Sequence, residues 1–129
     1  MFSDLASCLR ANQEGRLADW VHTYLCSEAS NPGLAEVLIS RVTHFQLEKV
    51  PLVSLERIIG PEPSMKYVEK SELFEKRVFE LRTALEQGAK FPPLIVTDIW
   101  TKNSVSDGGH RLEALRRSGR EEYWIVRCC

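Results

Sequence analysis

Two adjacent glycines, Gly108 and Gly109, stand between an aspartate and a histidine–arginine pair in the run 107–111. Glycine lacks a Cβ atom, so the backbone can turn sharply there and successive N–H groups can converge on one point. A helix that begins at this turn adds the positive end of its dipole at the same place. The run therefore predicts a site for phosphate or another small anion, formed by Asp107, Gly108, Gly109, His110 and Arg111.

Each of these residues also has a plainer role that the sequence leaves open. The glycines can form an ordinary tight turn with positive φ. Arg111 can pair with Asp107 or Glu113 instead of binding a ligand. Asp107 is predicted to cap the following helix, and its alternatives are to hold His110 in place or to reach a metal.

Composition limits the classes of protein to which the chain can belong. Its 129 residues are 43% hydrophobic and 27% charged, which is typical of one globular domain. The formal net charge of −1 gives no global basic field of the kind that a non-specific DNA binder uses. No apolar run approaches the roughly 20 residues needed to cross a bilayer, and no signal peptide is apparent. We expect a cytoplasmic protein that does not enter the membrane.

The four cysteines lie at positions 8, 26, 128 and 129, without a C-x-x-C spacing. Cys8 and Cys26 fall on or near apolar helical faces, so we expect both to be buried hydrophobic residues. Cys128 and Cys129 end the sequence, and we expect mobile thiols there. No metal site is predicted.

Residues 1–45 are expected to form an N-terminal helical subdomain of three short helices. Ser3 is the predicted cap of the first helix, and Asn31 with Pro32 begins the third. The second has the clearest helical spacing of apolar residues: Leu17, Trp20, Val21, Tyr24 and Leu25. We expect these helices to pack on a sheet or on a second subunit.

Residues 46–129 alternate between strand-like and helix-like patterns, which predicts a mixed α/β (α+β) domain. Strands are predicted over 50–55, 94–100, 104–106 and 123–127. A Pro/Gly-rich loop covers 60–64. One helix is expected between the N-cap Ser71 and the C-terminal Gly88, and another runs from Arg111 to Ser118.

From about residue 50 to residue 127, the chain resembles the ParB/sulfiredoxin superfamily. The resemblance implies a mixed sheet with flanking helices, and a signature turn and helix whose glycine and basic residues hold nucleotide phosphates. Three segments carry it, in the expected order: Val50-Pro51-Leu52 leading to Gly60-Pro61, Phe91-Pro92-Pro93-Leu94-Ile95-Val96, and Asp107-Gly108-Gly109-His110-Arg111-Leu112-Glu113-Ala114.

Departures from the family pattern separate its branches. In sulfiredoxins the turn is similar to Gly-Gly-Cys-His-Arg, with the cysteine as the nucleophile. Gly109 occupies the cysteine position in this sequence, so the nucleophilic sulfur is missing. Partition proteins carry an Arg-Arg type pair and a helix-turn-helix that this sequence does not show, so we do not expect DNA binding. Free-serine kinases resemble Asp-Gly-His-His-Arg, which differs only at Gly109.

The resemblance implies a nucleotide ligand, ATP, ADP or CTP, with Mg²⁺. An NTP hydrolase or a small-molecule kinase is the enzymatic form of this prediction, with His110 and Glu62 as catalytic residues. Glu62 is the candidate base, and Glu56 and Asp107 are its alternatives. Trp100 is expected to be a core or interface residue, and its alternative role is to stack on a nucleobase, because it lies near the turn in the sequence. The competing prediction is a non-enzymatic accessory module whose N-terminal helices bind a second copy or another protein.

Overall fold

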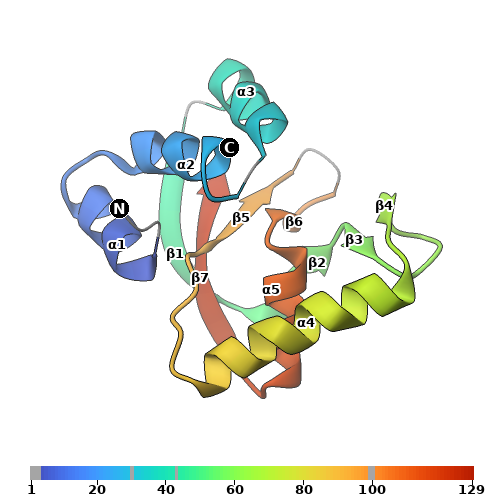
Figure 1. Cartoon of the computed structure of the whole chain (residues 1–129). Coiled ribbons are helices and arrows are strands. Elements are labelled where there is room, and N and C mark those ends of the chain that lie inside the picture. Colours follow the sequence, from blue (N-terminus) through green and yellow to red (C-terminus); the bar gives the residue numbers. More distant parts are fainter. Residues whose placement is uncertain (1–3, 30, 43, 99–100) are drawn as a thin grey trace.

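The structure is a computed structural model that describes residues 4–29, 31–42, 44–98 and 101–129. A mixed sheet lies between two groups of helices (Figure 1). The elements in chain order are α1 (Leu5–Gln13), α2 (Leu17–Cys26), α3 (Pro32–Arg41), β1 (Phe45–Pro51), a 3-10 turn (Leu52–Ser54), β2 (Glu56–Arg57), β3 (Ile59–Gly60), β4 (Tyr67–Val68), α4 (Ser71–Glu86), β5 (Leu94–Thr97), β6 (Ser104–Asp107), α5 (Gly109–Arg117) and β7 (Glu122–Cys128).

The main sheet has five strands in the order β1-β7-β5-β6-β2. β5 runs parallel to β7 and antiparallel to β6, while β1 is antiparallel to β7 and β2 is parallel to β6. β3 and β4 form a separate parallel pair. The prediction of a mixed α+β fold with flanking helices is therefore confirmed.

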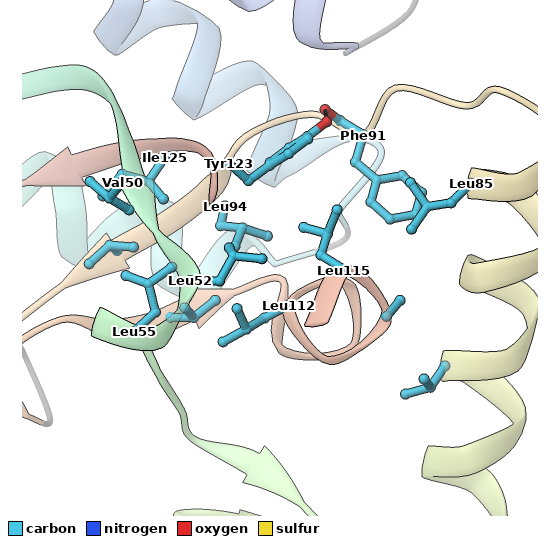
Figure 2. Packing of buried hydrophobic residues seen from close by; sticks show 14 of the residues in the cluster. Val50, Leu52, Leu55, Leu85, Phe91, Leu94, Leu112, Leu115, Tyr123 and Ile125 are labelled. Carbon is cyan, nitrogen blue, oxygen red and sulfur yellow. Dashed lines mark hydrogen bonds between the residues drawn. The ribbon is translucent and has the colours of Figure 1, made fainter. Parts of the chain in front are cut away.

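The central strand, β5, is buried on both faces because its side chains alternate between two cores. Leu94 and Val96 of β5 join the core under α4 and α5, whereas Ile95 joins the core under the N-terminal helices. Figure 2 shows Leu112 and Leu115 of α5 facing Leu94 in the first of these cores. This packing fixes the place where β6 ends and α5 begins.

The N-terminal helices α1–α3 cover the second face of the sheet. The predicted apolar residues of α2 are all buried and pack with Val126 and Cys128 of β7. Phe45, the last residue of the predicted helical subdomain, is the first residue of β1. None of the helices among the described residues is long and apolar enough to span a membrane.

Several predicted boundaries differ from the structure. The strand predicted over 50–55 begins earlier, at Phe45, and gives way to a 3-10 turn after Pro51. Pairing with β7 selects this register, and proline has no N–H to continue the ladder. Lys70, not Ser71, is the N-cap of α4, without a side-chain hydrogen bond.

The first helix and the strand beginning at residue 94 extend toward residues outside the described parts of the chain. Asp4 is the N-cap of α1 and forms a reciprocal capping box with Ser7, whereas the predicted cap Ser3 lies outside the described residues. β5 is described to Thr97, and the predicted continuation to Trp100 is not described.

The cysteines are distributed differently from the prediction. Cys8 and Cys128 are buried, and Cys26 and Cys129 are exposed. The expectation was wrong for Cys26, which lies at the solvent end of α2. It was also wrong for Cys128, which points into the core under the N-terminal helices because its strand pairs with β1 as far as this residue.

Candidate anion-binding site

The predicted turn lies where β6 passes into α5. β6 ends at Asp107, Gly108 has φ +112°, and α5 starts at Gly109. The Gly108 carbonyl accepts from the Leu112 amide at 2.8 Å, which begins the helical ladder. No described residue accepts from the amides of Gly109, His110 and Arg111, and no side chain caps this helix. These are the unsatisfied donors that make a helix N-terminus attractive to an anion.

Close packing requires glycine at both positions of the turn. A Cβ atom on Gly108 would lie 2.8 Å from both Arg111 Nη2 and Leu94 Cδ2, and its positive φ would be strained. A Cβ atom on Gly109 would lie 2.6 Å from Cγ2 of Ile59. The pair of glycines therefore lets α5 begin directly against β5 and β3.

A cavity of about 580 Å³ opens at this turn. Residues 105–110 line one side, and Ile59 of β3 lies beside them. Leu34 and Val37 of α3 form an apolar part of the wall. The N-terminal helices therefore contribute directly to the cavity that holds the predicted site.

The segment before α4 supplies a cation and an aromatic ring to the same cavity. Lys66 and Tyr67 both line it, and the Lys66 ammonium lies 5.4 Å from the centroid of the Tyr67 ring. The Tyr67 side chain remains 54% exposed. Sequence reasoning missed both residues, which stand apart from any motif and reach the site only through the pairing of β3 with β4.

The guanidinium of Arg111 is hydrogen-bonded to groups of the protein itself. Its residue is only 9% exposed, and Nη1 donates to the carbonyls of Pro92 at 2.6 Å and Pro93 at 3.2 Å. Nη2 donates to Asp107 Oδ2 at 3.0 Å. The guanidinium lies outside the lining of the 580 Å³ cavity and borders a neighbouring one of about 490 Å³. Its place as a phosphate ligand stays a prediction, and its bonds to Asp107 and the two prolines are what the structure shows.

Asp107 is not the N-cap of α5, so that prediction was wrong. Gly108 occupies the cap position with left-handed backbone, which carries the Asp107 side chain away from the helix amides. One carboxylate oxygen accepts from Arg111, and the other lies 3.5 Å from Nδ2 of Asn31 at the start of α3. Asp107 thus connects the turn to the N-terminal helices.

His110, the second residue of α5, is paired with a carboxylate that sequence reasoning did not find. Its Nε2 lies 2.6 Å from Oε1 of Glu69, and the two side chains are only 18% and 13% exposed. The Phe74 ring packs at 5.4 Å from the imidazole. Because 41 residues separate the pair, no local sequence signal could have indicated it.

The base predicted from the resemblance lies elsewhere. Glu62 accepts from Nη1 of Arg57 at 3.2 Å and also from Nη2, and it is not part of the cavity lining. The hydrogen bonds from Arg57 lower the pKa of the Glu62 carboxyl, which weakens it as a base. The alternative Glu56 accepts from Thr101 Oγ1 at 2.7 Å and does not line the cavity either.

The described residues do not provide a ready-made metal site. No group of three or more His, Cys, Asp or Glu side chains converges anywhere in the described ranges. Asp107 is the carboxylate in the lining of the 580 Å³ cavity, and it is already bonded to Arg111. Trp100, predicted to stack on a base, lies outside the described residues.

Comparisons with known proteins give one kind of match. No family model matches the chain, and no curated protein matches it. Among solved structures, the chain is similar to a Pnob8-like ParB-N domain with 19% sequence identity and a TM-score of 0.48. The match covers 69% of this chain but only 30% of that chain, so this chain spans less than a third of the neighbour's length.

Proposed function

We propose that the protein binds a phosphate-bearing nucleotide, of the class of ATP, ADP or CTP, in the 580 Å³ cavity. The phosphates would lie against the N-terminus of α5, and the nucleoside would extend along the wall formed by α3 and Tyr67. The observation that carries this proposal is the set of α5 amides without a partner among the described residues, at a turn that lines a cavity of this size.

The expected affinity follows from the groups that remain free to bind. A partly buried helix N-terminus favours an anion by up to about 2 kcal/mol. A charge-assisted hydrogen bond from His110 adds roughly 1.5–3 kcal/mol, and stacking on Tyr67 adds roughly 1–3 kcal/mol. Arg111 is left out because its guanidinium is already engaged. The sum, about 4.5–8 kcal/mol, corresponds to dissociation constants from about millimolar to about micromolar.

Magnesium would come with the nucleotide and not from a site on the protein. Mg²⁺ usually retains several waters and binds through one or two carboxylates together with substrate phosphates. In the cavity lining that role falls to Asp107, which is held by Arg111. The residues present therefore do not fit a dedicated Mg²⁺ site.

The proposal is confined to binding. Hydrolysis or phosphoryl transfer needs a base within reach of the acceptor oxygen. Glu62 is bonded to Arg57 outside the cavity lining, so its position gives no support to the predicted catalytic role. Activity and the acceptor remain predictions, to be tested by measuring nucleoside diphosphate release with and without free serine.

Isothermal titration with ATP, ADP, CTP and inorganic phosphate, each with and without Mg²⁺, tests the proposal. We expect at least one nucleotide to bind, and Lys66→Ala and Tyr67→Ala to weaken it. Lys76→Ala is the matched control, because Lys76 is an exposed lysine of α4 outside the cavity lining. If none of these ligands binds the wild-type protein at millimolar concentration, the proposal is wrong.

The competing function, a non-enzymatic module, has one observation in its favour. A second apolar hollow of about 510 Å³ lies between α2, α3 and β1, with Leu38, Ile39 and Phe45 among its lining residues. Ile39 is 66% exposed at its edge. If the N-terminal helices bind a partner or a second copy there, Ile39→Asp should abolish that association and leave nucleotide binding unchanged.

A further inference from the structure

We propose that Glu69 is a positioning residue, which holds the imidazole of His110 in the orientation that binds phosphate. This inference rests on the proposed function and deepens it. It assigns a role to a carboxylate that lies outside the signature turn, directly before α4.

The chemistry of the Glu69–His110 contact fixes which ring nitrogen faces the carboxylate. An ionised carboxylate only accepts hydrogen bonds, so the imidazole nitrogen at 2.6 Å must carry a proton. Nε2–H therefore donates to Oε1 of Glu69. Nδ1 is the nitrogen left for a ligand, and no described residue is bonded to it. In the doubly protonated ring, Nδ1–H donates to a phosphate oxygen while Glu69 balances the added charge.

Glu69 is itself held in place. Its backbone amide donates to the Gly60 carbonyl at 2.8 Å, which anchors it beside the β3–β4 pair. The Phe74 ring packs against the imidazole at an interplanar angle of 41° and limits its rotation from a second side. The orientation of His110 is therefore set by two groups that approach from outside α5.

The position of Glu69 also relates the contact to the ligand. Lys66 and Tyr67 line the cavity, and Glu69 follows them within the same short segment. His110 also lines that cavity, at the start of α5. The pair therefore connects the segment that would contact the nucleoside with the helix end that would contact the phosphates.

A double-mutant cycle on nucleotide affinity tests this role. Glu69→Gln retains the size of the side chain and a hydrogen-bond acceptor but removes the charge. We expect it to weaken binding about tenfold, which is the lower end of the loss seen when the carboxylate partner of a metal-ligating histidine is removed. In a His110→Gln background the same substitution should have no further effect. Glu72→Gln, an exposed carboxylate on the first turn of α4, should bind as the wild type does.

A spectroscopic readout separates positioning from general stability. In the wild-type protein the His110 Nε2–H proton should exchange slowly with water and give an observable imidazole N–H signal. Glu69→Ala should abolish that signal, and the exposed His22 and His44 should give no such signal in either protein. Melting temperatures identify any variant that fails to fold. If Glu69→Gln fails to fold, Glu69→Asp replaces it in the affinity test. Glu69→Asp keeps the charge but withdraws the carboxylate from His110 by one methylene.

The outcomes distinguish this inference from the proposed function. If the wild type binds nucleotide and Glu69→Gln binds equally well, the role of Glu69 is refuted and the proposed function stands. Additive effects of the two substitutions would also refute it. If the wild type binds no nucleotide or phosphate, the proposed function fails first, and this inference fails with it.

Discussion

Replacing Arg111 by alanine should cost the protein much of its stability, because this guanidinium joins three parts of the chain. It donates to the carbonyls of Pro92 and Pro93, which lead into β5, and to the carboxylate of Asp107 at the end of β6. Arg111→Ala would leave these acceptors without their donor. The Asp107 side chain is only 14% exposed, so water could not fully replace the lost partner.

The expected magnitude follows from that burial. Removing one partner of a buried ion pair typically costs about 3–5 kcal/mol, because the remaining charge is left uncompensated. For a chain of 129 residues this lowers the melting temperature by roughly 10–20 °C. Arg111→Lys should recover only part of the loss, because one ammonium cannot reproduce a planar guanidinium that donates from both Nη1 and Nη2.

Thermal and urea unfolding followed by circular dichroism measure this effect. Arg117→Ala is the matched control on the same helix, because Arg117 pairs with Glu75 and Glu113 near the surface. We expect the control to cost less than about 1 kcal/mol. If Arg111→Ala melts as the control does, the structural role assigned to Arg111 is wrong. A loss of nucleotide binding in Arg111→Ala would not by itself identify a ligand contact, because the substitution disturbs the turn.

Four further predictions concern packing and titration. Gly109→Ala should lower the free energy of unfolding by about 1–3 kcal/mol, because the Cβ atom of the new alanine would lie 2.6 Å from Ile59 Cγ2. Urea titration measures this loss, and an unchanged midpoint would contradict the close contact between Gly109 and Ile59. Burial raises the pKa of the Cys8 and Cys128 thiols to about 12, so a thiol reagent at pH 8 should label only Cys26 and Cys129 until the protein is unfolded. Because these two pKa values are raised from 9.0, stability is unaffected below about pH 9 and falls between about pH 9 and pH 12, which unfolding at a series of pH values would show. Tyr123→Phe should cost about 1–1.5 kcal/mol, because the buried hydroxyl donates to the Phe91 carbonyl at 2.6 Å (Figure 2); an equal melting temperature would argue against that bond.

The sequence by itself determined the elements whose signal is local. The apolar spacing of α2, the proline and asparagine that begin α3, and the glycine after α4 each specify a neighbouring conformation through contacts a few residues away. The glycine pair likewise specified the turn at residues 108–109, because positive φ and close backbone approach demand a residue without Cβ. Local periodicity and backbone geometry were sufficient for these features.

Tertiary structure alone decided the partners of the predicted site residues. Nothing near His110 in the sequence indicates Glu69, which lies 41 residues away, and nothing near Arg111 indicates the carbonyls of Pro92 and Pro93. The apolar wall supplied by α3 depends on helices packing across the sheet from α5. A side chain's partner depends on which elements the folded sheet brings together, and that pairing is a property of the whole chain. The sequence could therefore predict an anion site at the turn, while the fold decided which of the predicted donors are already bonded within the protein.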